Sequence, residues 1–303
     1  MKKPIPYSQV EIIERDTIKF GDPVFDKFIS TKGGIELGTM IALSGTSGAG
    51  KTTLCKKWQK DLNKDEVSVF YALESKKSSV AKQTNRIKTT CTSLICDVDT
   101  YPTWSEFMNY LYTDKPIMVI VDSLQHAASL LSKENGKYKY DNYKNIIKDL
   151  YDWKDDTQGI VILICQLNEK GKMEGPASTI FDVDCPIKLT ADPKTGERFM
   201  ETEKNRMGPI GKIFYQFVES DDCIKFYTSN EWAFINCGVS FYDAMATAAT
   251  NYIEAFSNHK NYNAFRKEFM SLQTKGCKNL SSEIEYLNMV NKLIVELKEK
   301  YFE

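Results

Sequence analysis

A glycine-rich motif occurs at residues 45–52, where the chain reads Gly45-Thr46-Ser47-Gly48-Ala49-Gly50-Lys51-Thr52 and fits the phosphate-loop pattern G-x-x-x-x-G-K-[ST] at every required position. The apolar run 40–44 before it predicts a buried strand, and residues 53–58 after it predict a helix. In this context backbone N–H groups and the positive end of a helix dipole point at phosphate oxygens. The motif therefore predicts a nucleotide site rather than a glycine-rich turn that binds nothing.

The predicted site takes ATP and Mg²⁺ as cofactors. Lys51 is expected to reach the β- and γ-phosphates, and the Thr52 hydroxyl is expected to complete the Mg²⁺ coordination. The predicted nucleotide-binding residues are Gly45, Thr46, Ser47, Gly48, Ala49, Gly50, Lys51, Thr52 and Thr53.

The amino-acid composition limits the classes of protein to which the chain can belong. With 303 residues, 42% apolar and 27% charged, the chain is long enough for one large α/β domain and an appendage. A net charge of −1 gives no overall attraction to polyanions, so any nucleic-acid binding must come from a local patch. The eight cysteines form no C-x-x-C pair, and no apolar run approaches the length of a membrane span. We expect a soluble, cytoplasmic protein with reduced thiols and no membrane partner.

Strands and helices alternate after the motif. Apolar runs at 67–73, 94–96, 116–121 and 160–165 predict strands, with helices between them, and this alternation favours a mostly parallel sheet. We expect the strand 67–73 to lie beside the phosphate-loop strand. From residue 184 the pattern predicts an antiparallel extension that begins with a hairpin around the turn 192–196.

Two strand ends carry carboxylates. Asp122 follows the strand 116–121, where it is expected to hold Mg²⁺ through water opposite Thr52. Glu74 follows the strand 67–73, where a carboxylate close to the γ-phosphate is able to activate water. The alternatives are a buried strand that happens to end in Asp, and a surface Glu that begins a helix.

Together with Gln166 and the run Glu203-Lys204-Asn205-Arg206-Met207-Gly208-Pro209, these features resemble RecA-fold ATPases over roughly residues 15–228, with the DnaB helicases and the RadA (Sms) branch-migration ATPases as the most similar types. The resemblance implies a RecA-like three-layer core. It implies that Glu74 activates the attacking water, and that Gln166 senses the γ-phosphate and signals to an adjacent DNA-binding loop. It also implies that Lys204 and Arg206 cross a subunit boundary to a neighbour's γ-phosphate. A capped strand end and a solvated basic edge are the respective alternatives.

The resemblance further implies single-stranded DNA as a partner and a homo-oligomer, either a ring, with a hexamer expected, or a filament. Residues 132–144 are expected to form a polar loop in which lysines bind phosphates and Tyr138, Tyr140 and Tyr143 stack on bases, and a second loop covers 169–176. The predicted DNA-binding residues are Lys137, Lys139, Lys144, Lys170 and Lys172. A merely solvated loop is the alternative.

The domain prediction divides the chain into a RecA-like core, residues 1–238 with a lead-in at 1–38, and a C-terminal helical region, residues 239–303. An apolar stripe that runs from Leu280 to Tyr301 predicts a helix that packs on the body of the same chain, with a contact to another subunit as the alternative. Three functions remain open. They are an ATP-dependent motor or clamp on single-stranded DNA in replication, recombination or repair, a KaiC-type ATPase that acts on protein assembly without DNA, and a small-molecule kinase.

Overall fold

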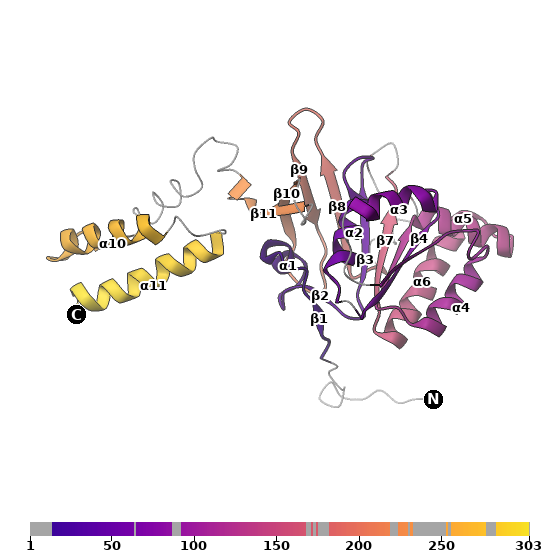
Figure 1. The fold of residues 1–303 in the computed structure, drawn as a ribbon, viewed down its shortest axis with the longest axis horizontal. Helices are drawn as coiled ribbons and strands as arrows, with labels where there is room; N and C mark the ends of the chain where they lie inside the picture. Colours follow the sequence, from indigo (N-terminus) through magenta and orange to yellow (C-terminus); the bar gives the residue numbers. More distant parts are fainter. Residues whose placement is uncertain are drawn as a thin grey trace. The chain divides into compact units, whose positions relative to one another are not determined.

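A computed structural model of the chain describes residues 14–63, 65–86, 92–167, 171, 174, 182–218, 224–229, 231–232, 253, 256–276 and 283–302 (Figure 1). The chain divides into two compact units, Met1–Phe226 and Tyr227–Glu303. The expected boundary between residues 238 and 239 lies outside the described residues and stays a prediction.

Nine of the described strands form one sheet in the order β11-β10-β9-β8-β3-β7-β6-β4-β5. Its strands are β3 (Met40–Gly45), β4 (Val67–Ala72), β5 (Thr92–Cys96), β6 (Met118–Asp122), β7 (Ile160–Cys165), β8 (Cys185–Ala191), β9 (Arg198–Thr202), β10 (Gly211–Phe217) and β11 (Ile224–Tyr227). Neighbours pair in parallel from β8 to β5, whereas β8, β9 and β10 pair antiparallel. The predicted parallel sheet with an antiparallel extension is confirmed.

One predicted neighbour is wrong. The strand that precedes Glu74, β4, was expected beside the phosphate-loop strand β3, but β7 and β6 lie between them. Strand β7 pairs with β3 on one side, with Met40 opposite Val161, and with β6 on the other, with Met118 opposite Ile160. Apolar pattern gives the order of strands along the chain, and a later strand is free to insert between two earlier ones. The carboxyl ends of β3, β7, β6 and β4 still share one edge.

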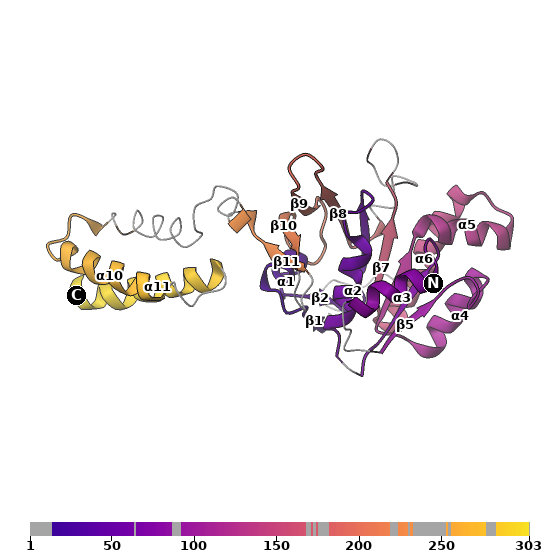
Figure 2. The same ribbon diagram turned by 45° about the horizontal axis from the view of Figure 1, so that its top comes forward.

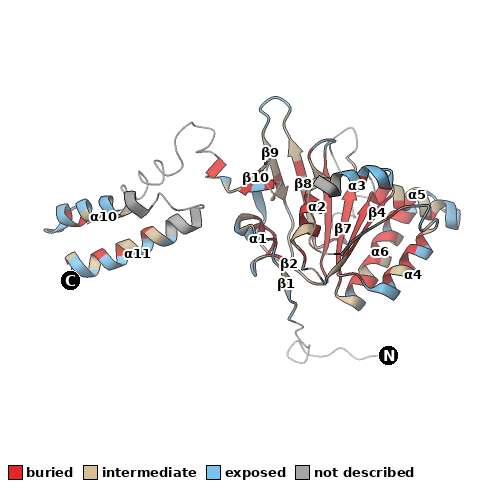
Figure 3. Cartoon of the chain, viewed as in Figure 1, coloured by how far each residue is buried: buried red, intermediate tan, exposed pale blue. Residues whose placement is uncertain are grey.

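Helices cover both faces of the parallel part of the sheet (Figures 1 and 2). These are α2 (Lys51–Asp61), α3 (Lys77–Arg86), α4 (Trp104–Asp114), α5 (Leu124–Asn135) and α6 (Lys139–Thr157), while α1 (Pro23–Ile29) lies against β10 of the antiparallel extension. Alternate strand residues face opposite layers, so Leu43 and Ile162 pack with α1 and α2, while Ala42 and Leu163 pack with α4, α5 and α6. The central strands are buried along most of their length (Figure 3), as expected for a doubly covered parallel sheet.

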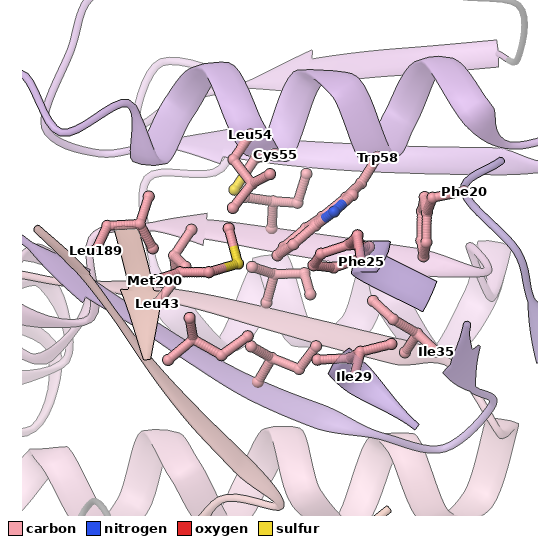
Figure 4. Close-up of a cluster of buried hydrophobic side chains, with 14 of the residues drawn as sticks. Phe20, Phe25, Ile29, Ile35, Leu43, Leu54, Cys55, Trp58, Leu189 and Met200 are labelled. Carbon is pink, nitrogen blue, oxygen red and sulfur yellow. The ribbon is translucent and has the colours of Figure 1, made fainter. Parts of the chain in front are cut away.

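The lead-in segment belongs to this core. Asp22 caps α1 by accepting hydrogen bonds from the backbone N–H groups of Val24 and Phe25, and Pro23 occupies the first helical turn. The Phe25 ring centroid then lies 5.4 Å from that of Trp58 on α2 (Figure 4). Both side chains are fully buried, so α1 fixes the helix that follows the phosphate loop. The lead-in also holds a two-stranded sheet of β1 (Thr17–Ile18) and β2 (Ile35–Glu36).

The loop expected at residues 132–144 is wrong, because α5 continues to Asn135 and α6 begins at Lys139. Gly136 ends α5 in the left-handed conformation, with a φ of 70°, and its N–H bonds to the Ser132 carbonyl. The buried amide of Asn142 donates to the Ser132 hydroxyl and to Asn135. These bonds satisfy the Asn142 amide, one of the polar side chains that favoured a loop in the sequence.

The second unit contains α10 (Tyr262–Gly276) and α11 (Glu283–Phe302). Val290, Ile294 and Leu297 of the predicted stripe are buried in one cluster with Phe265 and Phe269 of α10, so this part of the stripe packs within the chain. Leu280 lies outside the described residues. Among the helices that the structure describes, none is both long and apolar enough to cross a bilayer.

Candidate nucleotide-binding site

A cavity of about 760 Å³ opens at the carboxyl ends of the parallel strands, where open α/β sheets bind ligands. Its lining residues are Gly45, Thr46, Ser47, Gly48, Gly50, Lys51, Thr52, Thr53, Glu74, Ser75, Asp122, Gln166, Leu167, Gly171 and Phe217. The fold therefore brings Glu74, Asp122 and Gln166 to the phosphate loop. Ala49 of the motif is fully buried beneath it.

The conformation of the loop depends on its glycines. Gly48 and Gly50 have φ values of +76° and +98°, which side chains rarely adopt. A Cβ at Gly50 would also lie 2.3 Å from the Phe217 ring. Lys51 begins α2, and its ammonium donates to the carbonyls of Gly45 at 2.8 Å and Thr46 at 3.2 Å. Its charge is thus held within the loop, at the end of the helix where anions bind.

Asp122 and Glu74 meet although their strands lie away from β3. The Asp122 carbonyl accepts the N–H groups of Leu73 at 2.7 Å and Glu74 at 2.9 Å, which fastens the end of β4 to the end of β6. Asp122 is 5% exposed, whereas Glu74 is exposed in the cavity wall. Burial raises the pKa of Asp122 to about 7, and the negative charge of Glu74 adds to the rise. The Lys51 ammonium opposes it.

The residues present fit Mg²⁺. Among the described residues, none forms a hydrogen bond or an ion pair with the buried Asp122 carboxylate, and the Thr52 hydroxyl lines the same cavity. Mg²⁺ prefers oxygen ligands and is usually held by one or two protein groups together with substrate phosphates and waters. The described part of the chain contains no cluster of three or more His, Cys, Asp or Glu side chains that could hold a metal alone. Thr52 and Asp122 would therefore hold the ion together with a nucleotide.

Sequence reasoning missed three residues of the antiparallel extension that support the loop. Arg198 Nη1 donates to the Gly48 carbonyl at 2.9 Å, and the Tyr215 hydroxyl donates to the Ala49 carbonyl. Phe217 lines the cavity, with the Arg198 guanidinium 4.9 Å from its ring centre. The alternation of Tyr215 and Phe217 placed both on one face of a strand, but nothing in the sequence linked that face to the loop.

Lys204 and Arg206 lie away from the cavity. Arg206 Nη1 donates to Asp184 Oδ1 at 3.0 Å, and Lys204 Nζ donates to the Val183 carbonyl. The other Asp184 oxygen accepts the N–H of Met40, at the amino end of β3. The phosphate loop follows the carboxyl end of that strand, five residues and about 17 Å further on. The pair thus lies too far from the phosphate loop of the same chain to reach into its cavity.

The predicted DNA-binding lysines differ in their surroundings. Lys137 and Lys144 are exposed, as are Tyr138 and Tyr140, whereas Lys139 forms a 3.2 Å ion pair with Glu174. Lys170 and Lys172 lie outside the described residues. Tyr143 was expected to stack on bases, but that prediction is wrong, since α6 turns its ring into the core with 3% exposed.

The chain is similar in sequence to a family of ATPases and to curated DNA repair proteins. A family model described as "ATPase: KaiC" matches residues 18–231. The DNA repair protein RadA of Helicobacter pylori is 25% identical over 225 residues, which are 70% of this chain and 48% of that protein. RadA of Escherichia coli is 21% identical over 209 residues, 68% of this chain and 44% of the relative. The chain thus spans about half the length of these relatives.

Among solved structures, a KaiC-like protein from the hyperthermophilic archaeon Pyrococcus horikoshii superimposes with a TM-score of 0.54 at 20% identity. The match covers 71% of this chain and 100% of that structure. At this identity the likeness extends to the fold, and it agrees with a RecA-like core.

Because Asp122 is buried, we expect its ionisation to lower the free energy of unfolding of the nucleotide-free protein. Because the pKa is raised from 3.8 to about 7, the folded state binds this proton more tightly than the unfolded state, and the contribution of Asp122 to the free energy of unfolding falls as pH rises through that range. Asp122→Asn should match the wild type near pH 4 and exceed it by at least about 1 kcal/mol at pH 8. Urea denaturation in EDTA measures this. The exposed Asp152→Asn is the control, and a pH-independent difference would contradict the assignment.

Proposed function

The chain belongs to the KaiC family of ATPases, and we propose that it is a cytoplasmic, ATP-hydrolysing motor or clamp on single-stranded DNA. It works as a ring or filament whose active sites lie between subunits. The observation that carries this proposal is the separation within one chain of the cavity at Lys51 from the cations of Lys204 and Arg206. A site that needs both is completed only by a second copy.

Each residue of the cavity has its own proposed role in ATP hydrolysis. Lys51 and the backbone N–H groups of the loop would bind the phosphates, and Thr52 and Asp122 would hold Mg²⁺, which supplies positive charge against the phosphates when bound. Glu74 is exposed in the cavity, where it accepts a proton from the attacking water. Gln166 lies at the end of β7, between the ends of β3 and β6, as a sensor of the γ-phosphate requires.

DNA as the partner is supported by two observations. The curated relatives are named DNA repair proteins. The junction of α5 and α6 also presents Lys137 and Lys144 with Tyr138 and Tyr140, 84% and 61% exposed, which suits a strand whose bases stack and whose phosphates need cations. Protein assembly without DNA, as in a KaiC-type ATPase, is the second candidate, and the family match favours it equally. A small-molecule kinase would leave Gln166 and Arg206 without a role.

The first prediction separates binding from turnover. Lys51→Ala should remove ATP hydrolysis and weaken nucleotide binding, since it deletes a phosphate contact. Glu74→Gln should leave binding intact and remove turnover, because an amide does not accept the proton from water. Equilibrium binding of a fluorescent ATP analogue and steady-state phosphate release measure the two effects. Equal loss of binding in both variants would contradict the role of Glu74.

The second prediction tests the partner. Single-stranded DNA should stimulate ATP hydrolysis, and Lys137→Ala/Lys144→Ala should weaken DNA binding at unchanged basal hydrolysis. The slope of log affinity against log salt should flatten by about 0.7 for each phosphate that the variant no longer neutralises. The control is Lys148→Ala/Lys292→Ala, which removes two lysines whose side chains are each 76% exposed. Hydrolysis that ignores DNA would favour the KaiC-type alternative instead.

The third prediction tests the shared site. An Arg206→Ala chain keeps its own Lys51, and a Lys51→Ala chain keeps its own Arg206. Each alone should be nearly inactive, because a cation supplied by a neighbour accelerates hydrolysis by about 10³ to 10⁵ in such systems. Mixing them should restore part of the activity, since some interfaces join an intact loop to an intact Arg206.

The matched control mixes Lys51→Ala with Glu74→Gln. Both changes fall within one cavity, so every interface of that mixture lacks one or the other, and no activity should return. If the first mixture stays as inactive as the second although co-assembly is demonstrated, Arg206 does not act on a neighbour.

A further inference from the structure

We propose that Gln125 is a positioning residue that fixes Gln166 at the edge of the cavity and joins it to Glu174. The inference rests on the proposed role of Gln166 in sensing the γ-phosphate. It assigns to the buried side chain of Gln125 the link between Gln166 and Glu174.

Gln125 lies in the first turn of α5, three residues after Asp122, and is 1% exposed. Its Oε1 accepts the backbone N–H of Gln166 at 3.0 Å, and its Nε2 donates to the backbone carbonyl of Glu174 at 3.0 Å. The N–H of Glu174 in turn donates to the Gln166 carbonyl at 2.8 Å. Three hydrogen bonds thus close a ring between the end of β7, the start of α5 and Glu174.

The far end of this ring is anchored on α6. The Glu174 carboxylate accepts from Lys139 Nζ at 3.2 Å and from the Tyr143 hydroxyl at 3.4 Å. Tyr143 is almost fully buried, so its hydroxyl is a fixed point of the core. Glu174 therefore moves relative to α6 only by breaking these contacts, while Gln125 is held by the body of α5.

A buried apolar side chain would pack α5 against β6 and β7 as well as a glutamine does, and it would bring no polar group of its own into the core. The amide instead bonds two backbone groups that no strand pairing satisfies, one on each side of the segment 167–173. Asp122 and Gln166 both line the cavity, so the amide lies directly behind it. A shift of Gln166 toward a bound phosphate is thereby transmitted to Glu174, and by linkage a shift of Glu174 acts on Gln166.

The test replaces the amide by an apolar side chain of similar length, Gln125→Met. The matched control is Gln59→Met, since Gln59 is also fully buried and its amide contacts neither Gln166 nor Glu174: it donates to the Ser68 hydroxyl of β4 at 2.7 Å and accepts from Lys56 Nζ at 3.0 Å. Both substitutions are expected to lower the melting temperature, so the melting temperature does not decide between them.

The first readout is hydrogen–deuterium exchange of peptides that contain Gln166 and Glu174. A non-hydrolysable ATP analogue with Mg²⁺ should slow exchange at both places in the wild type and in Gln59→Met. In Gln125→Met the Glu174 response should disappear. If Glu174 still responds to the nucleotide in Gln125→Met, the link runs elsewhere and the proposal is overturned.

The second readout is a double-mutant cycle on basal hydrolysis without DNA. Gln125→Met should lower kcat by roughly tenfold at nearly unchanged KM for ATP, and should have little further effect in a Gln166→Ala background, because residues that act as a unit are not additive. Gln59→Met should combine multiplicatively with Gln166→Ala. Multiplicative effects for Gln125→Met would overturn the proposal while leaving the ATPase intact. Failure of DNA to stimulate hydrolysis would bear only on the proposed partner.

Discussion

The pairing of β7 with two strands at once is the constraint on which the rest of the molecule depends. Its hydrogen bonds to β3 and β6 fix the distance between the phosphate loop and Asp122. Gln166 directly follows the last residue of this strand, Cys165, so the sheet places a polar side chain between the two. Since every backbone group of a central strand is paired, this spacing does not vary without loss of many bonds. The cavity is therefore a property of the sheet, with loops only lining it.

Residues outside the sequence motif support the phosphate loop. Arg198 and Tyr215 bond the outer carbonyls of the loop, and Phe217 lies so close to Gly50 that a methyl group there would collide with the ring. On the inner side, Trp58 and Phe25 hold α2 against the sheet. Preorganised backbone donors lose little freedom on binding an anion, which is what makes such a loop effective.

The charged residues of the cavity and the cation that we propose acts on a neighbouring subunit lie at opposite ends of β3. Lys51, Glu74 and Asp122 gather at the carboxyl end, whereas Arg206 is paired with Asp184 at the amino end. In a head-to-tail assembly the amino end of one copy faces the carboxyl end of the next, so this polarity suits a ring or a filament. The proposed path through Gln125 and Glu174 leads from the cavity toward α6, where the exposed Tyr140 lies.

Sequence alone determined the phosphate loop, the alternating elements and the strand-end residues Asp122 and Gln166, because these depend on local pattern and on chemistry at fixed spacing. The sequence-based prediction was wrong about which strand neighbours β4, and about the loop expected at 132–144. In that segment Asn142 of α6 hydrogen-bonds to Ser132 of α5, a contact between two helices that local pattern does not reveal. Only the tertiary structure decided that Arg198 supports the loop and that Arg206 lies far from it. Both depend on which strands lie side by side, and strand order is set by packing of the whole sheet rather than by any one segment.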